Sequence, residues 1–242
     1  MRLRLFLDFD GTVTAEDVGN AFFRTFGGAV CDAHVERYRA GLISARECFR
    51  AETQAIGLLD VAAAGSFARS RTVDAGLRGL LAFCHESGIE CLIVSDGLDF
   101  YIREILQEQG LGHAEFVSNL LRFGGTESGG KAAVSVEFPH DDAECDRCAC
   151  CKRNVMLSRT PDEEIIVYVG DGFSDRCVVQ YADVVFAKGE LQTFCRERNI
   201  SYYPYMTLED VRSRLARLQE AQRVRRPRRA HLLRRELYDR EP

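Results

Sequence analysis

The stretch from Leu3 to Thr14, LRLFLDFDGTVT, constrains the fold of this chain more than any other part of the sequence. A short apolar run that ends at a glycine turn is typical of a buried strand. Because side chains alternate along a strand, Asp8 and Asp10 fall on the same side, at its carboxyl end. In open α/β sheets that end binds ligands, and two acids there repel each other unless a cation or a shared proton intervenes. The alternative interpretation is an ordinary acidic turn between strand and loop.

Further strand and helix patterns follow this first strand in alternation. Short apolar segments at 90–95, 165–170 and 183–187 each end near Gly, Ser or Asp. Helical periodicity occupies 73–87 and 100–109. Alternating strands and helices predict an α/β fold, with a Rossmann-like parallel sheet flanked by helices.

Two segments interrupt the alternation. Residues 15–75 carry helical patterns and no clear strand, which predicts a small all-helical cap inserted after the first strand. Residues 120–138 contain two β-prone pieces around a glycine-rich tip, which predicts a β-hairpin excursion. We therefore expect a core at 1–14 and 76–220, the cap at 15–75, and an arginine-rich C-terminal tail at 221–242.

Composition and charge narrow the class of protein. The 242 residues are 46% hydrophobic and 29% charged, as is usual for a globular chain. No stretch is long and apolar enough to span a bilayer, and the N-terminus lacks a secretory leader, so we expect a cytoplasmic protein.

The C-terminal tail is strongly basic. It holds eight arginines between Arg223 and Arg240, although the net charge of the whole chain is −5. Such a tail could bind nucleic acid or an anionic membrane surface, whereas a solvated or frayed terminus is the more common case. We do not expect it to bind nucleic acid.

Four short motifs each follow a predicted strand or lie between two of them. They are Asp8-x-Asp10, Ser95-Asp96-Gly97, Lys152, and the run from Gly170 to Asp175. Each alone has a simple structural explanation: a Gly-Asp-Gly turn, a serine helix cap, or a solvated lysine. Their order along the chain favours one shared site.

These motifs resemble those of the haloacid dehalogenase (HAD) superfamily of phosphotransferases. The helical insert after the first motif is similar to the small cap of the phosphoserine-phosphatase-like branch. Finer features, among them Ser95-Asp96-Gly97-Leu98-Asp99-Phe100 and the Cys-Cys-Lys at 150–152, resemble the subgroup of 2-hydroxy-3-keto-5-methylthiopentenyl-1-phosphate phosphatases. The resemblance runs from the first strand to about Tyr205 and does not cover the tail.

The resemblance and the chemistry of phosphoryl transfer suggest the same residue roles. Asp8 is the expected nucleophile, forming an aspartyl-phosphate, and Asp10 the expected general acid and base. Lys152 and Ser95 would compensate charge on the phosphoryl oxygens.

A Mg²⁺ ion is the expected cofactor. Asp8, the backbone carbonyl of Asp10, and Asp171 would bind it, with Asp175 as a ligand or an orienting neighbour.

Substrate contacts are expected from Asp17, Ser95, Asp96, Gly97 and Lys152. Asp17 stands where the phosphoserine phosphatases have a substrate-sensing glutamate, although an acid at a helix N-terminus explains it equally well. Arg46 and Arg50, one turn apart in the cap, could point at the site, but a solvated basic face is the simpler interpretation.

A cysteine cluster directly precedes Lys152. Cys145, Cys148 and Cys151 have zinc-like spacing, and His140 is a possible fourth ligand. The alternatives are reduced thiols or a disulfide formed on oxidation.

The sequence thus predicts a Mg²⁺-dependent phosphomonoesterase whose partner is a small phosphorylated metabolite. Alternatives within this class are phosphatases for phosphoethanolamine, phosphocholine or phosphoserine. A non-catalytic binding module that uses the basic tail is the alternative from another class. The oligomeric state is not predicted.

Overall fold

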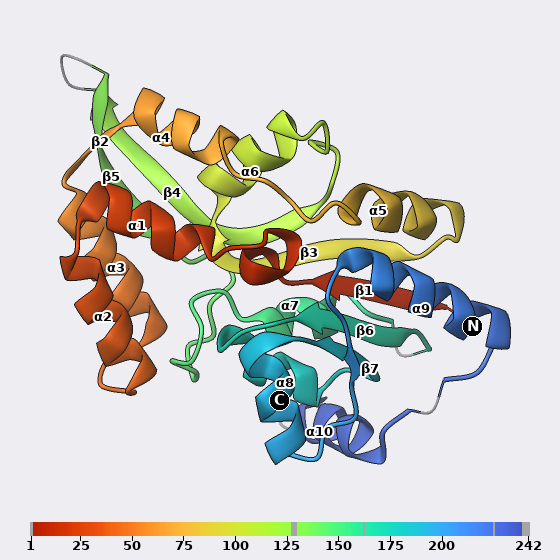
Figure 1. Cartoon of the computed structure of the whole chain (residues 1–242). Coiled ribbons are helices and arrows are strands. Elements are labelled where there is room, and N and C mark those ends of the chain that lie inside the picture. Colours follow the sequence, from red (N-terminus) through yellow and green to blue (C-terminus); the bar gives the residue numbers. More distant parts are fainter. Residues whose placement is uncertain (1, 127–129, 162, 225, 239–242) are drawn as a thin grey trace. The chain divides into compact units, whose positions relative to one another are not determined.

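A computed structural model shows two compact units (Figure 1). It describes residues 2–126, 130–161, 163–224 and 226–238. The first unit comprises Met1–Val13, Asp74–Val94 and Lys152–Pro242. The second comprises Thr14–Val73 and Ser95–Cys151.

A parallel sheet forms the centre of the first unit. Its strands are β1 (Leu3–Leu7), β3 (Glu90–Leu98), β6 (Ile165–Gly170), β7 (Val184–Ala187) and β8 (Tyr203–Pro204). Their order is β3-β1-β6-β7-β8, and each neighbouring pair is parallel. All six residues of β6 are buried, as expected for a strand covered on both faces. This confirms the predicted Rossmann-like sheet.

Helices flank this sheet (Figure 1). They are α5 (Leu77–Glu86), α7 (Lys152–Ser158), α8 (Gly189–Glu197), α9 (Leu208–Ala221) and α10 (Arg228–Tyr238). Three short helical turns complete the unit: η1 (Phe9–Val13), η2 (Ser174–Arg176) and η3 (Val178–Gln180). Helix α9 begins at a capping box of Thr207 and Asp210 and packs against α5.

Among the described residues, part of the arginine-rich tail is folded and not frayed. Its residues 228–238 form α10, in which Ala230 is buried. Arg234 donates hydrogen bonds to the Tyr181 carbonyl at 2.7 Å and to Asp183 Oδ1 at 2.9 Å. Arg229 donates to the Arg198 carbonyl at 3.1 Å. Arginine density alone misses this because the partners of these side chains lie far away in the sequence.

The second unit combines helices with an antiparallel sheet. The helices are α1 (Val18–Gly27), α2 (Val30–Arg39), α3 (Ala45–Ile56), α4 (Val61–Arg69) and α6 (Asp99–Glu108). Helix α3 begins at the predicted capping box, in which Ser44 Oγ accepts from the Glu47 amide and the Glu47 carboxylate accepts from the Ser44 amide. Phe22 anchors an aromatic cluster with Phe26, Phe67 and Tyr101, which joins α1 to α4 and α6.

Strands β2 (Leu58–Asp60), β5 (Lys131–Glu137) and β4 (Phe116–Thr126) form the sheet of this unit, in that order. The β4–β5 pair is the predicted hairpin, although residues 127–129 of its glycine-rich tip lie outside the described residues. Strand β2 corrects the expectation that 15–75 is all helical. Three residues are too short for a visible alternation, and the partner strand β5 is distant in sequence. The second unit also contains residues 95–151, whereas the sequence pattern assigns these residues to the core.

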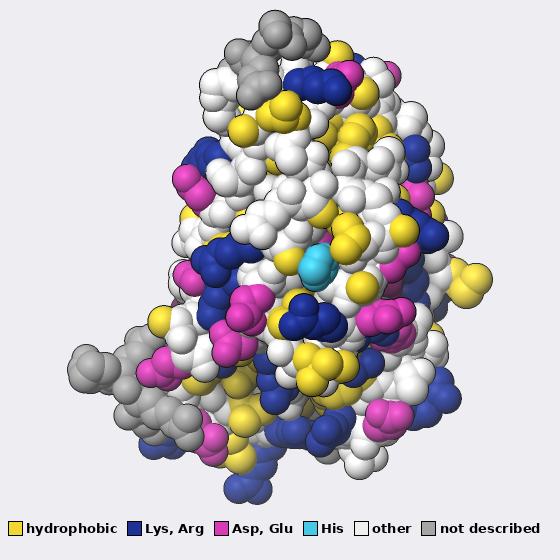
Figure 2. Space-filling model, turned by 90° about the vertical axis from the view of Figure 1, so that its left-hand side faces the viewer, with side chains coloured by type: hydrophobic (Ala, Val, Ile, Leu, Met, Phe, Trp, Pro, Cys, Tyr) yellow, Lys and Arg dark blue, Asp and Glu magenta, His cyan; other side chains and the backbone are white. Residues whose placement is uncertain are grey.

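The surface is mixed in character. On the face in Figure 2, hydrophobic side chains are scattered among charged ones of both signs. None of the described helices is long and apolar enough to cross a membrane.

Candidate active site

The first acidic residue of the site directly follows β1. The Asp8 amide donates to the Val169 carbonyl of β6 at 2.9 Å, which fixes the end of the strand against its neighbour. The Asp8 side chain is buried, and Asp10 is partly buried in the following turn η1. Gly11 in that turn has φ +76°, and a Cβ there would lie 2.4 Å from Asp171 Oδ2. Glycine is therefore required where the turn passes the second acidic motif.

The second acidic pair follows β6. Asp175 Oδ2 accepts hydrogen bonds from the amides of Asp171 at 3.0 Å and Gly172 at 3.1 Å, which closes the loop after the strand. Carboxylate oxygens of Asp8, Asp171 and Asp175 all lie within 4.8 Å of one another. The parallel sheet thus brings together acids separated by more than 160 positions in the sequence.

Lys152 joins these acids. It is the first residue of α7, and its side chain is only 1% exposed. Its ammonium donates to Asp8 Oδ1 at 2.5 Å, to Asp175 Oδ1 at 2.7 Å and to Ser174 Oγ at 3.0 Å. A buried lysine with two carboxylate partners keeps its charge where a developing negative charge can use it.

The site holds more negative than positive charge. Burial raises the pKa of Asp8 well above its usual value; Asp175 adds to this effect and Lys152 opposes it. Burial and Asp175 also raise the pKa of Asp171 to about 6, while the hydrogen bond from Thr12 opposes the rise. Three clustered carboxylates against one ammonium leave a deficit of positive charge that a cation would fill.

The donor set fits a hard divalent cation. Among the described residues, the candidate ligand atoms grouped here are the carboxylate oxygens of Asp8, Asp171 and Asp175, and Mg²⁺ binds a few carboxylates together with water and phosphate oxygens. Soft or imidazole ligands favour other metals and are missing from this trio. The backbone carbonyl of Asp10 remains a predicted ligand.

Sequence reasoning missed three hydroxyl groups that support the acids. Thr12 Oγ1 donates to Asp171 Oδ1 at 3.0 Å, and the Tyr168 hydroxyl donates to Asp175 Oδ1 at 2.6 Å. The Tyr205 hydroxyl lies 3.3 Å from Thr12 Oγ1 and donates to the Gly170 carbonyl at 3.2 Å. Tyr168 gave a usable signal, because a tyrosine inside an otherwise apolar buried strand needs a polar partner.

The second motif lies in the other unit. Ser95 is fully buried, and its Oγ accepts from the Gly97 amide at 2.8 Å. Asp96 Oδ1 accepts from the amides of Ala149 at 2.9 Å and Cys150 at 2.6 Å. Asp96 therefore holds the backbone directly before Lys152. Substrate roles for Ser95, Asp96 and Gly97 remain predictions.

The cysteine-rich loop is also held by the cap. Arg46 of α3 donates to the carbonyls of Asp142 at 3.0 Å and Cys145 at 3.3 Å, and to Asp146 Oδ1 at 2.6 Å. Only 14% of its side chain is exposed, so the predicted solvated basic face is wrong for Arg46. Arg50, one turn further along, lies over the Phe138 ring with its guanidinium 5.3 Å from the centroid.

The zinc candidates do not gather as the acids do. Among the described residues, Asp8, Asp171 and Asp175 are the one group of three or more such ligands within 4.8 Å. The Cys151 amide instead donates to the His140 carbonyl at 2.6 Å. A hydrogen bond with Cys151 and burial raise the pKa of Cys148, which favours thiol over thiolate. A zinc site at Cys145, Cys148, Cys151 and His140 remains a prediction.

Asp17 caps the first helix of the cap unit. Its Oδ1 accepts from the Asn20 amide at 2.8 Å, the geometry expected of an acid at a helix N-terminus. Burial raises its pKa. A role in selecting substrate remains a prediction.

Comparisons with known proteins agree with this geometry. Residues 5–180 match the haloacid dehalogenase-like hydrolase family. A 2-hydroxy-3-keto-5-methylthiopentenyl-1-phosphate phosphatase of Exiguobacterium sibiricum is 30% identical over 218 residues, covering 87% of this chain and 95% of the relative. The phosphatase of the same name from Geobacillus kaustophilus is 30% identical over 224 residues, covering 90% and 97%.

A solved structure shares the fold. The phosphoserine phosphatase from T. onnurineus superposes with a TM-score of 0.62 at 18% identity, covering 88% of this chain and 94% of that one. The family match and the two relatives show that the chain belongs to the haloacid dehalogenase-like hydrolases and is a phosphatase-type enzyme.

Proposed function

We propose that the chain is a Mg²⁺-dependent phosphomonoesterase that hydrolyses a small phosphorylated metabolite through an aspartyl-phosphate on Asp8. The observation that carries this proposal is the buried cluster of Asp8, Lys152, Asp171 and Asp175. A binding scaffold has no physical use for several carboxylates crowded around one buried lysine.

In the first half of the reaction, a carboxylate oxygen of Asp8 attacks the phosphorus atom. The bond between phosphorus and the leaving oxygen breaks, and Asp10 gives that oxygen its proton. In the second half, Asp10 takes a proton from water, whose oxygen attacks phosphorus and releases Asp8 and inorganic phosphate. Asp10 lies two residues beyond the nucleophile, so one turn supplies both groups.

Positive charge on the phosphoryl oxygens comes from Lys152, and Ser95 donates a hydrogen bond to them. The ion pair between Lys152 and Asp8 holds the ammonium beside the nucleophile before substrate arrives. A preorganised charge of this kind costs no rearrangement during the reaction.

Asp8, Asp171 and Asp175 would hold the Mg²⁺, together with the carbonyl of Asp10. When bound, the ion supplies charge compensation for a carboxylate that approaches an anionic phosphate. Thr12 and Tyr168 orient two of these carboxylates through their hydroxyl groups.

Hydrolysis of p-nitrophenyl phosphate tests the proposal. We expect activity that needs added Mg²⁺, stops with EDTA, and falls by about 10³-fold or more in Asp8→Asn, which keeps the shape but removes the nucleophile. Full activity in Asp8→Asn would remove the covalent intermediate from the mechanism. Trapping the phosphorylated enzyme by acid quench distinguishes this route from direct attack by water.

The names of the relatives support a proposal for the substrate class. They support a phosphorylated keto compound of the kind in the relatives' names as the first candidate. Phosphoserine, phosphoethanolamine and phosphocholine are the alternatives, because Asp17 could select a hydroxyl or an amine. A panel of these four phosphate esters ranks them by kcat/KM.

We also propose a cytoplasmic location. The ten cysteines all lie among the described residues and none of them forms a disulfide there, which suits a reducing compartment. Cell fractionation followed by immunoblotting tests this.

A further inference from the structure

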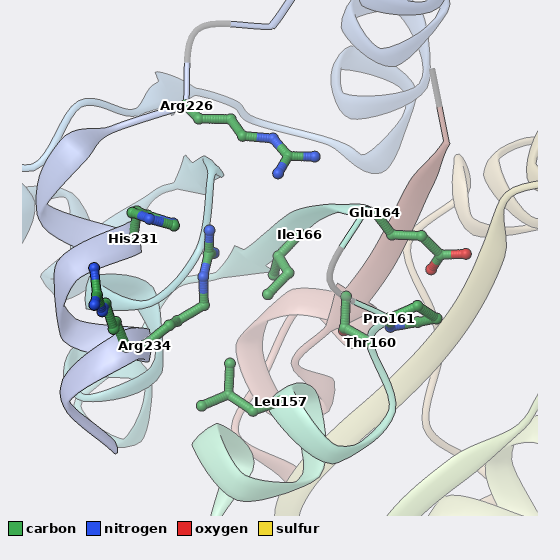
Figure 3. Close-up of a pocket in the computed structure, with 9 residues that line it drawn as sticks. Leu157, Thr160, Pro161, Glu164, Ile166, Arg226, His231 and Arg234 are labelled. Carbon is green, nitrogen blue, oxygen red and sulfur yellow. The ribbon is translucent and has the colours of Figure 1, made fainter. Parts of the chain in front are cut away.

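The tail forms one wall of a cavity in the first unit. The cavity has a volume of about 270 Å³ and lies between the tail and the start of β6 (Figure 3). Ile166 lines it, whereas the acidic site begins at Asp171, beyond the other end of the same strand. At about 3.3 Å per residue, the two places are roughly 15 Å apart along the strand. The cavity is therefore separate from the acidic cluster.

The basic wall of this cavity comes from the tail. Arg226, His231, Arg234 and Arg235 line it, and Figure 3 shows the first three across from Thr160 and Leu157. Hydrogen bonds fix this wall in place: Arg226 donates to the Glu163 carbonyl at 2.7 Å, and Arg234 donates to buried Asp183. Asp183 in turn accepts from the Ile166 amide at 3.0 Å, which ties the wall to β6.

The charge of the lining favours an anion. Glu164 is the single acid among the lining residues, and its Oε2 forms an ion pair with Arg4 Nε at 2.7 Å. Three arginines and a histidine stand against it, and one of these, Arg234, is paired with Asp183. The lining itself, with three arginines and one glutamate, carries an excess of positive charge. Guanidinium groups bind phosphate oxygens through paired hydrogen bonds.

The opposite wall is apolar. Leu157, Pro161 and Ile166 face the basic residues, so a ligand with a phosphate at one end and a carbon body at the other satisfies both sides. The volume is close to the small end of the range for ligand pockets, about 300–1,000 Å³. An extended nucleic acid would bind along a continuous basic face, whereas here apolar residues stand opposite the basic ones.

We propose that this tail pocket binds a small phosphorylated metabolite, at a site separate from the acidic cluster. The family match ends at residue 180, so the basic residues of the lining lie beyond it, whereas the opposite wall lies within it. Ligand binding there does not depend on the phosphatase mechanism.

Phenylphosphonate is a suitable probe, because a phosphomonoesterase does not cleave its carbon–phosphorus bond. The readout is the ring signal of His231 in NMR spectra of the full chain, assigned with His231→Gln. We expect a saturable shift of this signal. The same affinity in Lys152→Met would separate the pocket from the proposed catalytic site.

A charge placed on the opposite wall tests the site directly. Thr160→Glu should raise the dissociation constant at least about tenfold, because a like charge then faces the phosphonate. Thr160→Gln has the same size without the charge and should stay within about threefold. Ser158→Glu adds the same charge outside the lining and controls for long-range effects.

Three results would overturn the proposal. One is a His231 signal that phenylphosphonate does not move, and another is equal binding by the Thr160→Glu and Thr160→Gln proteins. The third is a single-stranded oligonucleotide that shifts His231 at lower concentration than phenylphosphonate and is insensitive to Thr160→Glu, which would make the tail a nucleic-acid site. Should Thr160→Glu fail to fold, Arg226→Gln supplies the same test from the tail, with Arg228→Gln as its matched control.

Discussion

Both units bury carboxyl groups, but the hydrogen-bond donors around these groups differ between the two units. In the first unit, Asp8 and Asp175 share the Lys152 ammonium, and Asp175 accepts further hydrogen bonds from Tyr168 and two backbone amides. In the second unit, Glu52 of α3 is 4% exposed, and its hydrogen-bond partner is the Cys48 thiol at 3.6 Å. Burial raises the pKa of Glu52 to about 8.

This difference separates a site from a packing position. A buried carboxylate with charged and amide donors has partners that favour its ionised form, the form that binds a cation or attacks phosphorus. A buried carboxyl with only a weak thiol donor is stable as the neutral acid, because burial penalises the charge and nothing repays it. The proximity of acids alone does not distinguish the two cases, whereas the number and kind of their hydrogen-bond donors do.

Removing Lys152 should have the largest effect on stability and activity, because it leaves buried carboxylates without their charged donor. In Lys152→Met, Asp8 and Asp175 remain buried without their ammonium, so we expect a loss of about 3–5 kcal/mol in unfolding free energy. Phosphatase activity should fall by about 10²–10³-fold. Urea unfolding and p-nitrophenyl phosphate hydrolysis measure the two effects.

The matched control is Lys188→Met. Lys188 is another of the three lysines and lies over the Tyr205 ring, 5.0 Å from its centroid. It should change stability by about 1 kcal/mol or less, the size of a cation–π contact. Equal losses in both variants would mean that the ion pairs of Lys152 contribute little.

Magnesium should stabilise the first unit measurably. If the three carboxylates bind the ion as proposed, they do so only when the sheet holds them together, so Mg²⁺ at 100 times its dissociation constant should add about 2.7 kcal/mol. Asp171→Asn should remove most of this gain, whereas Glu52→Gln should keep it, because Glu52 lies in the other unit. Thermal unfolding with and without Mg²⁺ gives the answer, and a gain that survives in Asp171→Asn would place the ion elsewhere.

The free energy of unfolding should also depend on pH through the carboxyl group of Glu52. Its pKa in the folded state, about 8, lies above its ordinary value of 4.5, so the unfolded chain loses this proton first. Stability from this group therefore falls as pH rises from about 4.5 to 8 and then levels off. Glu52→Gln removes that slope and should be more stable than the parent by about 4 kcal/mol at pH 8, and by about 1 kcal/mol or less at pH 5. If the difference in unfolding free energy between the two proteins were the same at every pH, Glu52 would be ionised in the folded state.

Much of the fold and the acidic site follows from the sequence because their signals are local. The apolar run before Asp8, the Gly-Asp-Gly after β6 and the Ser44 capping box each define a strand end or helix start within a few residues. Lys152 was identifiable because the chain has only three lysines.

What the sequence could not predict depends on partners far away in the chain. Strand β2 forms because β5 supplies its hydrogen bonds, and the tail helix docks because Asp183 receives Arg234. Arg46 looked like a surface arginine because its carbonyl partners lie about 100 residues later. Periodicity within a window contains no information about such pairs.

Asp96 offers an intermediate case and the smallest expected effect. Its carboxylate accepts two backbone amides of the loop before Lys152, so it fixes the loop without a charged partner in that contact. We expect Asp96→Ala to lower kcat by about tenfold with little change in KM, since a loss of roughly 1.4 kcal/mol in the placement of Lys152 affects charge compensation more than substrate binding. Asp96→Asn keeps an acceptor oxygen and should restore part of the rate.

Asp99→Ala is the matched control, because Asp99 accepts a hydrogen bond from the Leu121 amide at 2.9 Å, outside the loop before Lys152. An equal fall in kcat for Asp96→Ala and Asp99→Ala would reduce the role of Asp96 to general stability. A rise in KM alone would return it to the substrate contact that the sequence predicts.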